Sequence, residues 1–472
     1  MRYAVASLWI MTASLLAVEF AVAAEGDSQT YRLRSARQVG RIDRVTTVLE
    51  VQGDEIGKLD PQEKSRERIA VSVSCRREYD EKTLELPRQS PLGRSPKSPN
   101  PQIPKSPLEL PGQSPGWRAV RYYHEAAATV QEGQTVQKPL LRSDRHLICL
   151  EIAALQVTPF CPQGPLNLDE LELVSAPGNS LALDELLPAG PVAVGQKWQA
   201  SDQVMGVLLD LEAVTANSVE IVLKEVTPEI ARLELEGRVE GTLYGAAHQI
   251  DLKAKCRFDR RTERIDWFAM RVKQTQDVGL VERGMDVTVL VQIKIAPQEA
   301  SEPLADAALA GLPLRPTRAL RMLQYESPAG GWRMLHDRSW FLIEHYRDLD
   351  VFRRVDAGRD LALCRISLLP NVEPGRRISL ERFQADVQEA LGKNFGQFLQ
   401  ADERVDSGGK RILRLVVKGT DGDVPARWHY YHLSDERGHQ AALAFRIEQK
   451  RLEAFGAADE PLVASLRFVG KD

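Results

Sequence analysis

The feature of this sequence that most restricts its fold is the alternation of apolar and polar residues between positions 219 and 295. Stretches 231–239, 250–258 and 285–295 carry an apolar residue or glycine at every second position, with mostly charged or polar residues between. A period of two is typical of a strand with one buried and one hydrated face. Short joints with turn residues separate the stretches, so the sequence predicts an antiparallel meander.

The length predicts more than one domain, because 472 residues exceed what one hydrophobic core usually holds. Residues 25–296 are expected to form a β-rich domain. Residues 297–316, rich in Pro, Ala and Glu, are interpreted as an interdomain linker. The expected fold class is therefore mainly β: a large antiparallel meander sheet domain, followed over 317–472 by a smaller α+β domain.

The smaller domain is expected to be an antiparallel sheet with two helices. The first helix is predicted over 379–391, where Ser379 is a suitable N-cap and the apolar residues recur at helical spacing. The second is predicted over 451–463, before a final strand around 466–468. Two short helical turns are also predicted in the first domain over 166–188, around a loop at Pro177.

An insertion interrupts the first domain at residues 85–116. Nine of the 27 prolines lie between Pro87 and Pro115, and the sequence of residues 84–91 returns almost unchanged at 108–115. Proline removes backbone donors and disfavours a preceding helix, so we expect a disordered surface insertion. A spacer or a ligand for a proline-binding module is the functional alternative. The strand pattern resumes at Trp117, which places the insertion within a domain.

The first 24 residues are predicted to be a signal peptide. Arg2 precedes an apolar run over 4–18, and Ala21-Val22-Ala23 forms a small-x-small cleavage site. The run of roughly 15 uncharged residues, which ends before Glu19, is short of the roughly 20 needed to cross a bilayer. We therefore expect a periplasmic or secreted protein with no membrane span.

Charge and cysteine content exclude several classes of function. A net charge of −4 does not favour a nucleic-acid partner. The five cysteines are few for a disulfide-stapled scaffold, and no Cys/His spacing resembles a zinc site, so no metal and no cofactor are expected. Cys75 and Cys256 occupy buried-face positions of predicted strands. They are a candidate disulfide in an exported protein, with buried free thiols as the alternative.

No catalytic residue can be assigned from motifs. His124-Glu125 lacks the second histidine of a zinc-protease helix, and the paired carboxylates fall on the hydrated face of predicted strands. The most aromatic strand, 427–432, offers one candidate binding surface. Alternation places Trp428, Tyr430 and His432 on the same face, where they form either an aromatic patch for a partner or ordinary core packing.

Two resemblances add to these expectations. The stretch 188–198, a proline turn and valine strand ending in Gly-x-x-Trp, together with the meander that follows, resembles exported proteins of planctomycete-type bacteria. That resemblance covers most of residues 25–470 and implies no particular activity. The region from the Ser379 helix to the closing strand resembles the PsbP-like fold, which implies a non-catalytic protein that docks onto larger assemblies.

These observations favour an exported, non-catalytic protein that binds an envelope protein or polymer, or scaffolds an assembly. One alternative is a carrier that holds an apolar ligand against the inward residues of the meander. That lining is expected to comprise Leu233, Leu235, Leu252, Phe258, Val287 and Val289. A hydrolase whose site carries no familiar motif is the other alternative.

Overall fold

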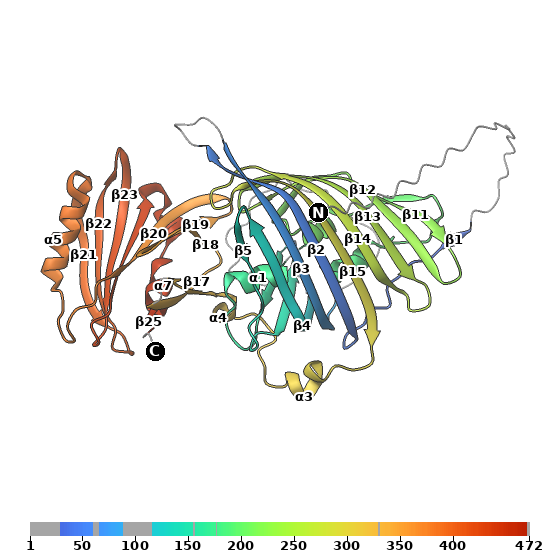
Figure 1. The fold of residues 1–472 in the computed structure, drawn as a ribbon, viewed down its shortest axis with the longest axis horizontal. Helices are drawn as coiled ribbons and strands as arrows, with labels where there is room; N and C mark the ends of the chain where they lie inside the picture. Colours follow the sequence, from blue (N-terminus) through green and yellow to red (C-terminus); the bar gives the residue numbers. More distant parts are fainter. Residues whose placement is uncertain are drawn as a thin grey trace, which may run out of the picture.

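The computed structural model describes residues 29–59, 66–87, 116–153, 156–175, 177–328 and 331–469. A large curved antiparallel sheet is followed by a smaller α+β domain at its side (Figure 1). The predicted fold class, mainly β with a meander sheet before an α+β unit, is confirmed. The predicted signal peptide and residues 88–115 of the predicted insertion lie outside the described residues.

The large sheet has 13 strands, most of them in the order β7-β6-β4-β3-β2-β15-β14-β13-β12-β11-β9. Their bounds are β2 (Ile42–Leu59), β3 (Arg66–Glu85), β4 (Trp117–Glu132), β6 (Leu147–Ala153), β7 (Gln156–Phe160), β9 (Lys197–Gln199), β11 (Glu220–Val226), β12 (Ile230–Leu243), β13 (Ala246–Asp259), β14 (Arg264–Gln276) and β15 (Gly284–Gln298). Short strands β5 (Thr135–Gln137) and β10 (Ala213–Asn217) pair with β4 and β12, and β1 (Thr30–Tyr31) pairs with β8 (Val192–Ala193) outside the sheet. The predicted meander is the run from β11 to β15.

Two antiparallel runs of strands meet in the middle of this sheet. β2, the first long strand, pairs with β15 along its length, from Ile42 opposite Gln298 to Ile56 opposite Gly284. β3 and β4 are direct neighbours, with Glu85 opposite Arg118. The proline-rich insertion therefore connects two adjacent strands of one sheet.

The inner face of the sheet is covered by the chain's own helical segment. This inner segment, residues 168–209, contains α1 (Leu168–Ser175), the 3-10 helix η1 (Ser180–Leu186) and α2 (Asp202–Leu209). The two helical turns around Pro177 are as predicted, whereas α2 was not predicted from the sequence. The inward-facing residues expected to line a ligand cavity are 2–7% exposed and share one core with the inner segment: Leu233, Leu235, Leu252, Phe258, Val287 and Val289.

A buried ionic cluster fixes the inner segment to the sheet. Glu81 on β3 is 1% exposed and accepts hydrogen bonds from Arg37 Nη1 at 2.9 Å and Arg121 Nε at 2.8 Å. Ser180 Oγ on η1 donates to the same carboxylate at 2.8 Å, and Arg37 Nε donates to Asp184 Oδ2 at 2.6 Å. Burial alone would raise the pKa of Glu81, but Arg121 and Arg37 outweigh it and hold that pKa below its usual value.

The segment interpreted as a linker packs against the large sheet. It contains η2 (Glu302–Leu304) and α3 (Asp306–Leu309), and α4 (Arg318–Arg321) follows. Leu304 and Leu309 are buried in a separate apolar cluster with Val120 and Phe160. Lys82 Nζ on β3 donates to Asp306 Oδ1 at 2.6 Å and to the Leu304 carbonyl at 2.9 Å. The connection between the domains is therefore tied to the first one.

The small domain is built on a seven-stranded antiparallel sheet in the order β18-β19-β20-β24-β23-β22-β21. Its strands are β18 (Trp340–Tyr346), β19 (Leu349–Asp356), β20 (Arg359–Leu369), β21 (Phe395–Val405), β22 (Arg411–Asp421), β23 (Val424–Ser434) and β24 (Gln440–Glu448). The helix α5 (Leu380–Leu391), followed by η3 (Gly392–Asn394), covers one face near β21 to β23 (Figure 1). It begins after Ser379, whose side chain accepts a hydrogen bond from the Arg382 backbone, as predicted.

A second layer covers the opposite face of the small sheet. It consists of β16 (Leu323–Glu326), β17 (Trp332–His336) and β25 (Arg467–Phe468), with η4 (Gln449–Arg451), α6 (Leu452–Phe455) and α7 (Asp459–Ser465). The predicted closing helix is thus divided, and Gly456, at a φ of 57°, ends α6.

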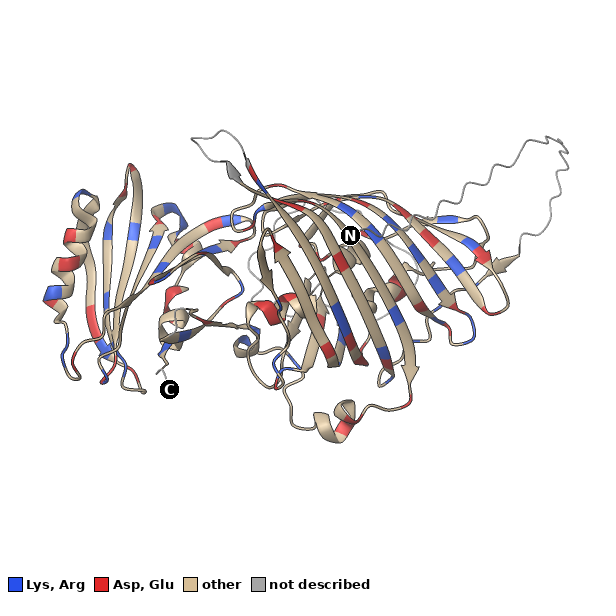
Figure 2. Cartoon of the chain, viewed as in Figure 1, with Lys and Arg blue, Asp and Glu red and all other residues tan. Residues whose placement is uncertain are grey.

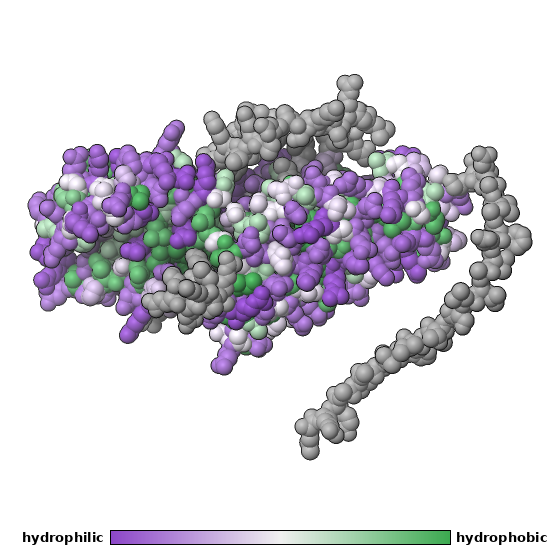
Figure 3. Space-filling view, turned by 90° about the horizontal axis from the view of Figure 1, so that it is seen from above, coloured by the Kyte–Doolittle hydropathy of each residue, from purple (hydrophilic) through white to green (hydrophobic). Residues whose placement is uncertain are grey.

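Within the described part of the chain, no helix has the length and apolarity that a membrane crossing requires. Acidic and basic residues are interspersed along the strands of the large sheet (Figure 2). Seen from above, most of the visible surface is hydrophilic, and an apolar area lies over the small domain beside its junction with the large sheet (Figure 3).

Candidate functional site

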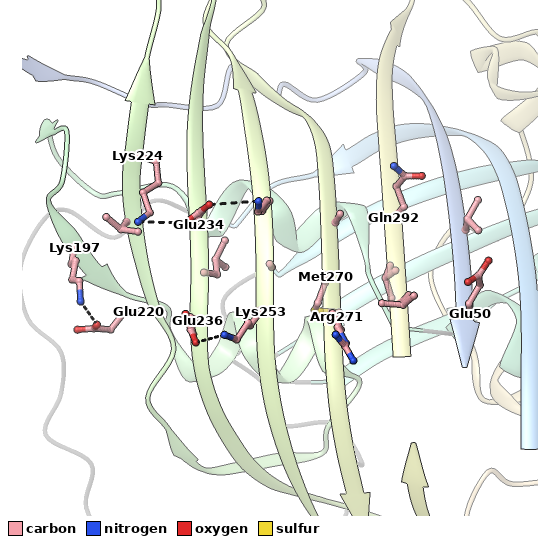
Figure 4. Close-up of a pocket in the computed structure, with 18 residues that line it drawn as sticks. Glu50, Lys197, Glu220, Lys224, Glu234, Glu236, Lys253, Met270, Arg271 and Gln292 are labelled. Carbon is pink, nitrogen blue, oxygen red and sulfur yellow. Dashed lines mark hydrogen bonds and ion pairs between the residues drawn. The ribbon is translucent and has the colours of Figure 1, made fainter. Parts of the chain in front are cut away.

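A groove of about 860 Å³ crosses the hydrated, outer face of the large sheet (Figure 4). It is lined from β9 through the meander to β2, so every strand of the meander contributes to it. Because alternate residues of a strand point to opposite faces, the charged positions of the meander line the groove while its apolar positions fill the core. The groove is therefore a direct product of the period-two pattern.

A ladder of ion pairs occupies the β9–β13 side of the groove (Figure 4). Lys197 Nζ lies 2.8 Å from Glu220, Lys253 Nζ lies 2.7 Å from Glu236, and Glu234 sits between Lys224 at 3.3 Å and Lys255 at 3.7 Å. These side chains are 43–75% exposed. Exposed pairs contribute only about 0–1 kcal/mol each, so the ladder offers charges to a partner at little cost to the fold.

The electrostatics of the ladder suit binding better than proton transfer. The neighbouring Lys253 lowers the pKa of Glu236, and Glu220 raises the pKa of Lys197. Both shifts keep the groups charged at neutral pH. A carboxyl that acts as a general acid needs the opposite shift, toward neutrality.

The centre of the groove is an exposed apolar residue between two charged side chains. Leu290 on β15 is 44% exposed, and its cross-strand partners are Arg271 on β14 and Glu50 on β2. Neither Arg271 nor Glu50 has an ion-pair partner among the described residues. This centre, which we call the Leu290 row, presents a cation, an apolar side chain and an anion in line across three strands.

The two cysteines proposed as a disulfide do not meet. Cys75 lies on β3 and Cys256 on β13, with β2, β15 and β14 between them. Four strand spacings of about 4.8 Å separate them by about 19 Å, far beyond disulfide reach. Both are free and buried, so the disulfide prediction is wrong and the alternative of buried thiols holds.

The aromatic residues of β23 pack beneath α5. His432 is 4% exposed, bonds Gln440 Oε1 through Nε2 at 2.9 Å, and lies edge-on to Phe383 of α5 at 5.8 Å. It is therefore a core residue and not part of a surface. Trp428 and Tyr430 stack at 6.1 Å and remain half-buried at the margin of the same cluster. The three residues do share a face, as alternation predicts, but α5 covers most of it.

The Leu290 row was not singled out from the sequence, although a signal for it is present. Residues 285–295 place apolar side chains at odd positions for the core. Leu290 breaks the rule as an apolar residue at a hydrated-face position between Thr288 and Gln292. Glu50 and Arg271 carry no such signal, because their positions on either side of Leu290 depend on how distant strands pair.

Comparison with known proteins adds little beyond the fold class. No protein-family model matches the sequence, and no curated protein matches it. The resemblance to exported proteins of planctomycete-type bacteria therefore stays an expectation.

Solved structures with partial similarity include two that match about a third of this chain. Cyanobacterial PsbP (CyanoP) from Synechocystis is 14% identical, with 32% of this chain and 93% of that chain covered and a TM-score of 0.25. The Ran-binding protein Mog1p of Saccharomyces cerevisiae is 12% identical, with 31% and 94% covered and a TM-score of 0.25. A lipovitellin structure is 10% identical over 56% of this chain and 26% of its own, with a TM-score of 0.28.

Proposed function

We propose that this chain is an exported, non-catalytic protein that binds a protein partner of the cell envelope through the groove on its large sheet. The observation that carries the proposal is the Leu290 row, an exposed leucine between an arginine and a glutamate that have no ion-pair partner in the described part of the chain. Export itself rests on the N-terminal sequence pattern.

The chemistry of the groove favours a protein over a charged polymer. A polyanion would be recognised by a surface of one sign, whereas both basic and acidic side chains line this groove. Protein interfaces combine an apolar centre with a polar, charged rim, and electrostatic complementarity then fixes orientation. Leu290 supplies such a centre, with the ion-pair ladder as one rim.

Two observations disfavour the alternatives to a protein-binding function, a carrier of an apolar ligand and a hydrolase. The inward residues expected to hold an apolar ligand are packed against the inner segment, so a carrier would first have to move that segment. In the ladder, Lys253 lowers the pKa of Glu236, which does not suit acid catalysis by that carboxyl group.

The proposal is tested by the variant Leu290→Glu in the full chain. Leu290 retains 44% exposure, and burying the remainder against a partner is worth about 1 kcal/mol, to which a buried charge next to Glu50 adds repulsion. We expect saturable binding to an envelope protein of the source organism to weaken at least ~10-fold, an effect of ~1.4 kcal/mol.

The matched control is Leu399→Glu. Leu399 lies on β21 of the small domain and is 42% exposed, so the two substitutions place the same charge at equally exposed strand positions. We expect the Leu399→Glu chain to bind like the wild type. Equal loss of binding in both variants, or in neither, would count against the groove as the binding surface.

A further inference from the structure

The inner face of the large sheet becomes polar at the end that faces the small domain. His248 on β13 and Gln276 on β14 are cross-strand partners and are only 3% and 4% exposed. Gln276 Nε2 donates to Glu282 Oε2 at 2.8 Å, so the buried carboxamide points at this carboxylate. Gln276 Oε1 and His248 Nε2 have no hydrogen-bond partner among the described residues. Buried polar atoms without a partner destabilise a fold unless a ligand or water pairs with them.

Carboxylates from three elements lie close enough for Glu282 to repel the other two. Glu282 lies between β14 and β15, Asp210 caps the C-terminus of α2, and Glu172 lies on α1. Burial, together with repulsion from Glu212 and Glu282, raises the pKa of Asp210 to about 6. Burial and repulsion from Asp169 and Glu282 raise the pKa of Glu172 to about 7, although this residue is exposed to solvent. The negative charge of Glu282 therefore repels the carboxylates of both Asp210 and Glu172.

No cation of the described chain neutralises this group. Glu172, Asp210 and Glu282 have no Lys, Arg or His nitrogen within 4.0 Å among the described residues. Arg338 is nearby, but its Nη2 donates to the Pro159 carbonyl at 2.6 Å and its Nε to the Arg321 carbonyl at 2.9 Å. The negative charge of these carboxylates is therefore available to a cationic ligand.

Aromatic rings border the carboxylates at the contact between the domains. Tyr244, in the hairpin between β12 and β13, lies edge-on to Phe341 of β18 with ring centroids 4.8 Å apart. Its backbone N–H donates to Glu212 Oε2 at 3.0 Å, which places the hairpin backbone beside a further carboxylate. Burial and the charges of Asp210 and Glu282 raise the pKa of the Tyr244 phenol, so it stays protonated.

We propose that this junction site, formed by Glu172, Asp210, Glu282, Gln276 and Tyr244, binds an organic cation with N–H donors, a primary ammonium or a guanidinium. The carboxylates and the free Gln276 carbonyl oxygen are hydrogen-bond acceptors, which such a group satisfies. Aromatic faces attract the same class of cation.

The test is calorimetric titration of the full chain at pH 8 and 150 mM salt with spermidine, tetramethylammonium and magnesium chloride. Spermidine is expected to bind at one saturable site, whereas tetramethylammonium, which has no N–H donor, binds at least ~10-fold more weakly. The variant Glu282→Gln should weaken spermidine binding ~10-fold, the scale of one charge-assisted hydrogen bond. Without ligand, this variant should melt at or above the wild-type temperature, because it relieves repulsion.

The matched control is Glu236→Gln, which removes an exposed carboxylate from the outer face of the same sheet. It should leave spermidine binding unchanged. The proposal is overturned if spermidine does not bind, if magnesium binds as tightly, if tetramethylammonium equals spermidine, or if the two glutamine variants weaken binding equally. Loss of partner binding in Leu290→Glu has no bearing on these results, so the two proposals fail separately.

Discussion

Replacing Glu81 by glutamine should loosen the inner segment from the large sheet. Glu81 is the only described carboxylate that bonds both Arg37 and Arg121, and it also accepts from Ser180 of η1. Glutamine keeps the shape of the side chain but removes its charge. Arg121, itself 2% exposed, then retains only neutral acceptors, such as Asn179 Oδ1 at 2.8 Å.

The size of the effect follows from burial. Removing one partner of a buried ion pair costs ~3–5 kcal/mol because a desolvated charge is left behind. Asp184 still pairs with Arg37, so we expect the lower end of that range, ~3 kcal/mol. An exposed carboxylate should behave differently, and Glu236→Gln, which breaks the pair with Lys253, should leave the unfolding free energy almost unchanged.

The assay is urea unfolding of both variants, combined with hydrogen exchange of residues 177–187. We expect Glu81→Gln to lower the unfolding free energy and to raise exchange in η1 more than in β13. Because the folded pKa of Glu81 is lowered, its contribution is present at neutral pH and is lost as pH falls below about 4.3 toward the folded value. The difference between wild type and variant should therefore shrink in acid. Equal stability of the two variants at pH 7 would refute this reasoning.

Three further predictions concern the core and its thiols. Gly178→Val should destabilise the fold by ~1–3 kcal/mol in urea unfolding, because a Cβ there meets Val291 Cγ1 at 2.7 Å and the φ of +91° strains any side chain; a neutral change would contradict the packing described. Burial and Arg467 lower the pKa of Lys410 to about 8, so the folded state releases this proton before the unfolded chain does. The stability of the wild type relative to Lys410→Met should therefore rise between pH 8 and ~10.4, and a flat or falling difference would contradict this. The full chain unfolded without reductant should react with five equivalents of iodoacetamide, since all five cysteines are free, and a count of three would indicate a disulfide.

The parts of the fold that depend on local pattern were predictable. Period-two alternation located β12, β13 and β15, and Ser379 with its spaced apolar residues located α5. In both cases one residue's environment depends on neighbours two to four positions away. The sequence carries that information directly.

The parts of the fold that depend on pairing between strands far apart in the sequence were not predictable. Nothing local indicates that β2 lies beside β15, and this pairing separates Cys75 from Cys256 by four strands. The alternation of β21 is interrupted by two register shifts, so a period-two pattern does not mark this strand in the sequence. α2 was missed because it is a single short apolar stretch, whose cap at Ser201 is its only start signal. The Leu290 row was predictable only in part. Leu290 is recognisable in the sequence as an apolar residue at a hydrated-face position, whereas its neighbours Arg271 and Glu50 are determined by the order of the strands.

The most direct test of the proposed function is site-specific cross-linking from the groove. A photoreactive amino acid replaces Leu290 in one chain and Leu399 in a second, and each is exposed to envelope extract with increasing wild-type chain as competitor. We predict one discrete adduct from position 290, suppressed by the wild type but not by Leu290→Glu, and no such adduct from position 399. An adduct that forms equally from both positions, or one that Leu290→Glu suppresses as well as the wild type, would contradict a partner-binding groove centred on Leu290.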